Sequence, residues 1–133
     1  MAKLRHLAIK SNDPDASAEF YKRAFEFDEV GRVGSAEAGG RAIYLSDGTM
    51  NVAIFSLTAE GLPNDEPHGL NHFGVVVDDL NKTMAQLTDL GAVCVQAPPP
   101  EGASITFETK FVTPDGVGFD ITTHGWPGIS NLD

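Results

Sequence analysis

The sequence predicts an α+β fold built from two similar halves, because three features recur about half a chain apart. In each half a His opens a short apolar run, an Asp follows where a helical pattern begins, and an Asp-Gly turn comes later. The paired positions are His6 and His72, Asp13 and Asp79, and Asp47 and Asp115. Agreement of three separate features at nearly one offset indicates an internal duplication.

Length, composition and charge restrict the class of protein. The chain of 133 residues is 41% hydrophobic and 21% charged, which is ordinary for one globular domain. No apolar run is long enough to span a bilayer and no N-terminal signal is visible, so we expect a cytoplasmic protein. The net charge of -10 argues against nucleic acid and anionic membranes as partners. The single cysteine, Cys94, falls in an apolar run, where we expect a buried structural thiol rather than a reactive one.

The first half predicts a strand, a helix and three further strands. The first strand covers residues 4–10 and directs His6 to one face of its sheet. Asp13 followed by Pro14 starts the helix, because the Asp accepts from free N–H groups and Pro has no N–H to satisfy. The apolar stripe of this helix is expected to pack on the sheet. It consists of Ala16, Phe20, Ala24 and Phe27, with Tyr21 and Phe25 widening it. The following strands are expected at 30–33, 41–45 and 50–57.

The second half predicts the same order of elements. A strand at 70–77 carries His72, and Asp79 caps a helix that ends where Gly91 suits a left-handed conformation. The apolar stripe of this helix comprises Leu80, Met84, Leu87 and Leu90. Further strands are expected at 92–96, 105–112 and 117–123. In the last of them Asp120 and His124 share the face opposite to Phe119 and Ile121, so the acid points away from the core.

The expected organisation is a single domain of two modules. Module one covers 3–58, a linker with two prolines covers 59–68, module two covers 69–125, and a tail covers 126–133. The tail has no periodicity, and Trp126 is expected to close over a cavity or to cover a subunit edge.

The motifs that open and close the halves resemble those of a known superfamily. They are His6-Leu7-Ala8-Ile9, Ala18-Glu19-Phe20-Tyr21, His72-Phe73-Gly74-Val75 and Pro114-Asp115-Gly116 with Asp120. This arrangement resembles the vicinal oxygen chelate superfamily, which includes glyoxalase I, methylmalonyl-CoA epimerase, extradiol dioxygenases, and fosfomycin and bleomycin resistance proteins. The likeness covers residues 4–124. It implies two βαβββ modules that form a curved mixed sheet around a metal-binding cavity, commonly in a homodimer.

The resemblance also implies a set of metal ligands. The strand positions that bind metal in this superfamily correspond to His6, His72 and Asp120, with Asp in place of the more usual Glu. The fourth position, counted from the Asp47-Gly48 turn, corresponds to Val52, which cannot bind a metal or carry a proton. Asn51 has the opposite parity, so a bulge would be needed to bring it to the metal.

Two imidazoles and one carboxylate suit Fe(II) first, with Mn(II), Ni(II) and Zn(II) as alternatives. A small substrate that chelates the ion through adjacent oxygens would have its developing negative charge stabilised by the metal. We therefore expect an enzyme, and Val52 favours dioxygenase-like chemistry over glyoxalase-like or epimerase-like lyase and isomerase chemistry. The alternative is a metal-free small-molecule or drug-binding protein of the bleomycin-resistance type.

Further site candidates are His124 and Glu108, each a possible catalytic acid or base and each equally compatible with an exposed position. The substrate is left open, because it depends on loops at 34–40 and 97–104. Whether the site forms within one chain or across a dimer is also left open, as are the identity of the metal and whether one binds beside Val52 and Asp120.

Overall fold

The computed structural model of the chain describes residues 2–35, 40–57, 68–98 and 108–129. The predicted linker at 59–68 and the loops at 34–40 and 97–104 fall largely outside the described residues. Among the described residues, no helix has the length and apolar character needed to cross a membrane.

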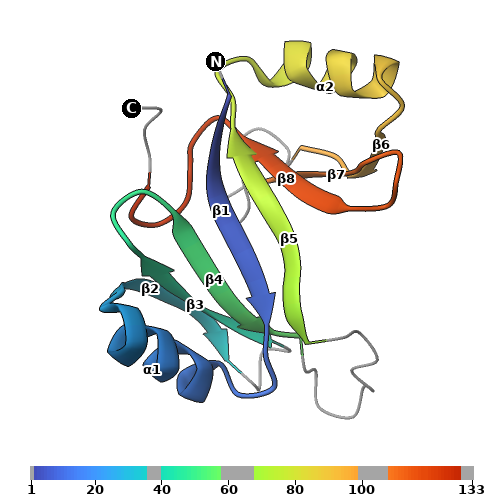
Figure 1. Ribbon diagram of the computed structural model, residues 1–133. Coiled ribbons are helices and arrows are strands. Elements are labelled where there is room, and N and C mark those ends of the chain that lie inside the picture. Colours follow the sequence, from blue (N-terminus) through green and yellow to red (C-terminus); the bar gives the residue numbers. More distant parts are fainter. Residues whose placement is uncertain (1, 36–39, 58–67, 99–107, 130–133) are drawn as a thin grey trace. The chain divides into compact units, whose positions relative to one another are not determined.

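Both halves fold as βαβββ modules, which confirms the predicted α+β class (Figure 1). The first module consists of β1 (Lys3–Lys10), α1 (Pro14–Phe25), β2 (Asp28–Ser35), β3 (Gly40–Ser46) and β4 (Asn51–Ser56). The second module consists of β5 (Gly69–Val76), α2 (Leu80–Asp89), β6 (Val93–Gln96), β7 (Thr109–Val112) and β8 (Gly118–Thr122).

The two modules have the same strand arrangement. The strand order is β2-β3-β4-β1 in the first module and β5-β8-β7-β6 in the second. In each module the opening strand pairs in parallel with the closing strand, β1 with β4 and β5 with β8. The remaining pairs are antiparallel, so the sheet is mixed. Equivalent residues of the two opening strands therefore occupy equivalent places in their modules.

The contacts divide the chain into two compact units, described separately below. The first unit contains residues 6–71 together with Trp126–Ile129. The second unit contains residues 72–125 with the start of β1. The segment Trp126–Ile129 thus follows the second module in sequence but makes its contacts with the first unit.

Helix α1 begins as the sequence predicts, but it buries a different face. The side chain of Asp13 accepts a hydrogen bond from the N–H of Ala16, and Pro14 occupies the first turn. The buried helix residues are Pro14 and Ala18, whereas Phe20 is 61% exposed. The expected stripe was therefore wrong for Ala16, Phe20, Ala24 and Phe25, which are all exposed. It was correct for Tyr21 and Phe27, which pack on the core.

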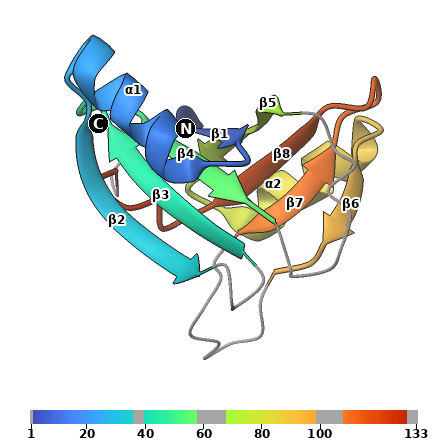
Figure 2. The ribbon, with the colours of Figure 1, turned by 90° about the horizontal axis from the view of Figure 1, so that it is seen from below.

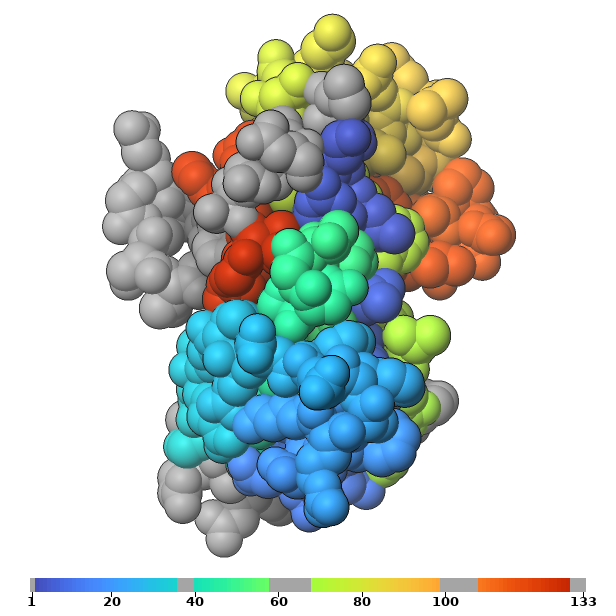
Figure 3. Space-filling view, turned by 60° about the vertical axis from the view of Figure 1, so that its left-hand side comes forward, coloured from blue at the N-terminus to red at the C-terminus, as the bar shows by residue number. Residues whose placement is uncertain are grey.

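The core of the first unit explains this rotation of α1. Ala18 packs against Ile43, Leu45, Val52 and Ile54 of β3 and β4, with Tyr21 and Phe27 at the edge. Figure 2 shows α1 lying over these strands. A small residue at position 18 lets the helix backbone approach the sheet closely, which a Phe at the contact would prevent. The outer surface of α1, beside β2, faces the viewer in Figure 3.

Helix α2 also keeps its predicted caps. Asp79 accepts from the N–H of Lys82, and Gly91 has a φ of 93°, the left-handed conformation expected there. Leu80, Met84 and Leu87 pack against a core of Ala92, Phe111, Phe119 and Ile121. Leu90 is 77% exposed, so it does not belong to the buried stripe. Cys94 is also exposed, contrary to expectation, because β6 is the outermost strand of its module.

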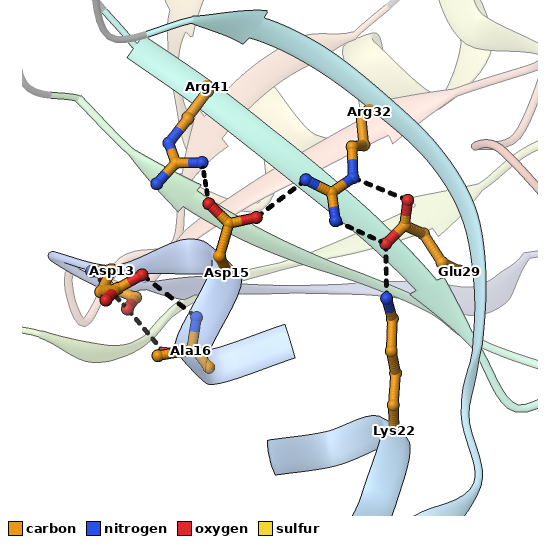
Figure 4. Close-up of polar contacts among 9 residues, drawn as sticks. Asp13, Asp15, Ala16, Lys22, Glu29, Arg32 and Arg41 are labelled. Atoms are coloured by element: carbon orange, nitrogen blue, oxygen red, sulfur yellow. Dashed lines mark hydrogen bonds and ion pairs between the residues drawn. The ribbon is translucent and has the colours of Figure 1, made fainter. Parts of the chain in front are cut away.

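An exposed ion-pair network joins α1 to β2 and β3 (Figure 4). Glu29 accepts from Arg32 at 2.7 Å and from Lys22 at 2.6 Å. Asp15 pairs with Arg41 and with Arg32. The hydrogen bonds from Arg32 and Lys22 lower the pKa of Glu29 to about 2. Those from Arg41 and Arg32 lower the pKa of Asp15.

Candidate functional site

The second unit brings His72 and Asp120 together on one face of its sheet. Asp120 on β8 is in register with Gly74 on the parallel strand β5, and His72 lies two residues before Gly74 on the same face. The imidazole Nε2 of His72 is 3.0 Å from Oδ2 of Asp120. Phe119 and Ile121 point to the opposite face and join the core. The predicted parity is therefore correct for Phe119, Asp120 and Ile121.

A glycine on β8 lies beside His72. A Cβ atom added at Gly118 would lie 4.0 Å from the Cβ of His72, which is ordinary van der Waals contact. Gly118 therefore lies next to the side chain of His72 on the neighbouring strand.

Lys110 is the third member of this cluster. It is paired with Asp120 across the antiparallel strands β7 and β8, and its ammonium nitrogen lies 2.7 Å from Oδ1 of Asp120. The same nitrogen is 3.4 Å from Oε2 of Glu108. The sequence places Glu108 and Lys110 on one face, but nothing in their spacing shows that Lys110 contacts the proposed carboxylate ligand. That contact follows from the register of β7 with β8.

Asp120 remains ionised in this surrounding. It is 1% exposed, and burial alone would raise the pKa of its carboxyl group. The hydrogen bond from His72, followed by the ion pair with Lys110, outweighs burial and lowers this pKa below its usual value. Burial likewise disfavours the charged form of Lys110, yet its pairing with Asp120 and Glu108 raises the pKa of the ammonium group. A buried carboxylate is thus available as an anionic ligand.

The first unit holds His6 in a buried polar setting. His6 is 2% exposed and is in register with Asn51, which is 0% exposed. The Nδ1 of His6 lies 2.7 Å from Oδ1 of Asn51, and the amide nitrogen of Asn51 donates to the carbonyl oxygen of Pro127 at 2.9 Å. The ring of Trp126 stacks on that of His6, with centroids 4.5 Å apart and planes 4° from parallel.

The assignment of Val52 as the fourth site position was wrong. Val52 packs in the core against α1, while Asn51 lies beside His6. No bulge is needed for this, because β1 and β4 pair without interruption from His6 with Asn51 to Lys10 with Phe55. Counting from the Asp47-Gly48 turn misplaced the strand by one residue, and in a strand one residue reverses the face.

The remaining candidates have different surroundings. His124 lies beyond the end of β8 in an exposed bend, and its N–H donates to the hydroxyl of Thr122. It does not continue the strand face of Asp120, as the sequence had suggested. Glu108 lies just before β7, half-buried beside Lys110. The catalytic roles of His124 and Glu108 stay predictions.

These features agree with a comparison to known protein families. The model of the Glyoxalase/Bleomycin resistance protein/Dioxygenase superfamily matches residues 3–121. The chain belongs to this superfamily. None of the curated proteins compared matches it.

Solved structures of the same fold are distant in sequence. A hypothetical protein from Bacillus halodurans has a TM-score of 0.73 at 16% identity, covering 91% of this chain and 93% of that one. Methylmalonyl-CoA epimerase from Mycobacterium tuberculosis has a TM-score of 0.67 at 17% identity, covering 90% and 85%. A methylmalonyl-CoA epimerase in complex with methylmalonyl-CoA has a TM-score of 0.66 at 19% identity, covering 91% and 93%. At these identities the similarity concerns the fold alone.

The donor set of this superfamily member suits a divalent cation. His6, His72 and Asp120 each offer one ligand atom, an imidazole nitrogen or a carboxylate oxygen. Imidazole and carboxylate ligands together suit Fe(II), Mn(II), Ni(II) and Zn(II). Asp120 is held in its ionised form, which metal binding requires. Lys110 is the feature that opposes metal binding, because its ammonium group already neutralises this carboxylate.

Proposed function

We propose that this protein is a divalent-metal-dependent enzyme that acts on a small substrate chelating the metal through two adjacent oxygens. His6, His72 and Asp120 would hold the metal. The proposal is carried by the contact between His72 and Asp120, which the parallel pairing of β5 with β8 directs to the face opposite the core. The proposal also requires that the imidazole of His6 reaches this pair. His6 lies on β1, which opens the first module as β5 opens the second.

The bound metal would act as a Lewis acid and stabilise negative charge that develops on the chelating oxygens. The chain itself supplies the anionic ligand Asp120 and a cation, Lys110, beside it. Lys110 would attract an anionic group of the substrate, and Glu108 would keep the ammonium group oriented through their contact at 3.4 Å. We retain Glu108 and His124 as candidate acids or bases, with Glu108 better placed because it contacts this cluster.

The residues on β4 favour oxygen chemistry over proton abstraction. The face of β4 that is in register with His6 carries Asn51 and Ala53, and neither side chain can accept a proton as a general base. Two imidazoles and one carboxylate, with further coordination positions open, are the donor set of non-heme Fe(II) oxygenases. We therefore place a ring-cleaving dioxygenase reaction with Fe(II) first. The structural similarity to methylmalonyl-CoA epimerase makes epimerisation the reaction to test against it.

Metal analysis tests the proposal directly. Protein purified without added metal, and protein soaked with Fe(II), Mn(II), Ni(II) or Zn(II) and desalted, should contain close to one equivalent of metal. The variant His72→Ala should contain far less, while His68→Ala, which changes a His four residues earlier, should match the wild type. Absence of metal from every wild-type sample would overturn the proposal.

Two assays then separate the reactions. Oxygen uptake with a panel of catechols under Fe(II) is expected if the enzyme is a dioxygenase. Exchange of the α-proton of methylmalonyl-CoA in deuterated water, without oxygen uptake, would instead assign an epimerase-like reaction.

The second candidate function is metal-free binding of a small molecule, as in bleomycin resistance proteins. The ion pair between Lys110 and Asp120 favours it, because a protein cation at 2.7 Å can take the place of a metal as counter-ion. This function predicts that affinity for bleomycin or a similar drug is unchanged by EDTA. Loss of drug binding on EDTA treatment would exclude it.

We also propose that the protein forms a homodimer through the outer face of α1. This face has an exposed apolar stripe and a surface depression lined by Ala16, Glu19, Phe20, Arg23 and Ala24. Glu19 and Arg23 lie four residues apart on one flank of the stripe. Two copies packed antiparallel about a two-fold axis near Phe20 would place Glu19 opposite the partner's Arg23. The face is therefore complementary in charge to a second copy of itself.

Sedimentation analysis tests the dimer. Phe20→Asp is expected to give a monomer, because it puts a charge on the symmetry axis, whereas Arg5→Asp should leave the dimer intact. A wild-type monomer at micromolar concentration would refute the proposal.

The cytoplasmic location stays a prediction from the sequence, and fractionation of the native host's cells would test it.

A further inference from the structure

A buried chain of hydrogen bonds reaches His6 from the tail of the protein. The carbonyl oxygen of Pro127 accepts from the amide nitrogen of Asn51 at 2.9 Å, and Oδ1 of Asn51 lies 2.7 Å from Nδ1 of His6. Asn51 and His6 are 0% and 2% exposed, so the contact between them is buried, and the contact with Pro127 is partly buried. A contact of this kind inside the protein is stronger and more specific than one in water.

The carbonyl group of Pro127 determines the donor and the acceptor of both hydrogen bonds in this series. A backbone carbonyl can only accept, so the NH₂ group of Asn51 must face Pro127. The amide oxygen of Asn51 must then face His6, where it can only accept. His6 therefore donates from Nδ1, and in the neutral imidazole the lone pair is on Nε2. Pro127 thus determines the tautomer of His6 through Asn51.

Trp126 holds the same ring from its face. The indole and imidazole rings are nearly parallel, and Trp126 is only 3% exposed. The segment itself is closed by two backbone hydrogen bonds between Trp126 and Ile129, of 2.7 and 2.8 Å. Ile129 is also buried. The described segment Trp126–Ile129 is therefore an ordered clip that restrains the position of His6 as well as its protonation.

We infer that Asn51 and the clip Trp126–Ile129 are positioning residues that hold His6 with its proton on Nδ1 and its lone pair on Nε2, ready for a divalent metal. The part of this inference that concerns metal binding rests on the proposed function. The part that concerns the tautomer of His6 does not. Ligating imidazoles depend on such a partner for their orientation, and loss of the partner typically weakens metal binding by about 10- to 100-fold. Asn51 has this role in place of a fourth ligand.

The tautomer can be measured in the wild-type protein without any metal. Long-range proton–nitrogen correlation spectra of ¹⁵N-labelled protein, recorded well above the pH at which imidazole is protonated, distinguish the two neutral forms. The signals of His6 are assigned by their loss in His6→Gln. We expect Nδ1 to be protonated. A spectrum with the proton on Nε2, or with rapid averaging of the two forms, would overturn the inference.

Variants then test the consequence for metal binding by calorimetry. Asn51→Ala is expected to weaken Mn(II) or Zn(II) affinity about 10- to 100-fold and to average the His6 tautomers. Asn51→Asp keeps an acceptor for Nδ1 and should retain the tautomer, although it loses the donor to the carbonyl oxygen of Pro127. Trp126→Leu should weaken affinity, and Trp126→Phe should restore it. Asn81→Ala, an exposed change on α2, is the control.

The outcomes separate this inference from the function it supports. Failure of the wild type to bind metal refutes the proposed enzyme, while the tautomer measurement still decides the role of Asn51. Wild-type metal binding that Asn51→Ala leaves unchanged refutes the positioning role alone. If circular dichroism shows that Asn51→Ala does not fold, the role of Asn51 is decided by the tautomer of His6 measured in Asn51→Asp and in the wild type.

Discussion

The ammonium nitrogen of Lys110 lies 2.7 Å from Oδ1 of Asp120, across the antiparallel pair of β7 and β8. A metal ion bound to this carboxylate would meet a positive charge in direct contact with its ligand. Two like charges this close repel, and the repulsion is stronger in a partly buried site than in water. Lys110 and the metal therefore compete for Asp120, and metal affinity reports that competition.

Removal of the competitor should strengthen metal binding. We expect Lys110→Met to bind Mn(II) or Zn(II) roughly fivefold more tightly, because the lost ion pair is partly exposed and contributes about 1 kcal/mol. Isothermal titration calorimetry measures the change, with Lys82→Met on α2 as the control. Equal or weaker binding by Lys110→Met would show that the ammonium group does not oppose the metal.

Substitutions of Asp120 can separate the effect of its negative charge on metal binding from the effect of its side-chain length. Asp120→Asn keeps the shape but removes the anion, so we expect loss of metal binding. Asp120→Glu keeps the anion and restores the longer side chain usual in the superfamily, so metal binding should persist. The added methylene in a site that is 1% exposed should lower the free energy of unfolding by about 1–3 kcal/mol. Metal analysis and urea denaturation of both variants provide the two measurements, and metal retention by Asp120→Asn would exclude Asp120 as an anionic ligand.

Local chemistry explains what the sequence predicts well. Asp13 and Asp79 cap helices through contacts with residues three positions away, so the sequence alone contains the necessary partners. The Asp47 turn is equally local, since its carboxylate accepts from the N–H groups of Thr49 and Met50. The strand parity of Asp120 follows because the apolar residues Phe119 and Ile121 define the core face.

Long-range pairing explains what the sequence does not predict. Asn51 contacts His6 because β4 pairs in parallel with β1, and a count from a turn does not reveal that register. Asn51 also contacts Pro127, which is 76 residues away, and no pattern in the sequence predicts this contact. The orientation of α1 was missed because the helix has apolar residues on two faces. Pattern alone does not show which of them meets the sheet.

The ion-pair network around Glu29 predicts a dependence of stability on pH. The pKa of this carboxyl is lowered from 4.5 to about 2 in the folded protein. Its stabilising effect is therefore complete above pH 4.5 and is lost as the pH falls toward 2. Because the network is exposed, we expect the effect to stay below about 1 kcal/mol.

Urea denaturation at a series of pH values from neutral to strongly acid measures this dependence. Glu29→Gln should be less stable than the wild type at neutral pH and should approach it in acid. Asp28→Asn, an exposed change at the neighbouring position, is the control. A constant difference between Glu29→Gln and the wild type at every pH would assign the effect to packing rather than charge.

Two Ala→Leu substitutions, one on each side of α1, can test which face of the helix is buried. Ala18 is 1% exposed against the strands, whereas Ala16 faces outward. Ala18→Leu should lower the free energy of unfolding by roughly 1–3 kcal/mol, because the core has no room for the larger side chain. Ala16→Leu should change it by less than about 0.5 kcal/mol. Thermal and urea denaturation compare the two variants, and the opposite ranking would mean that the helix packs through the stripe containing Phe20.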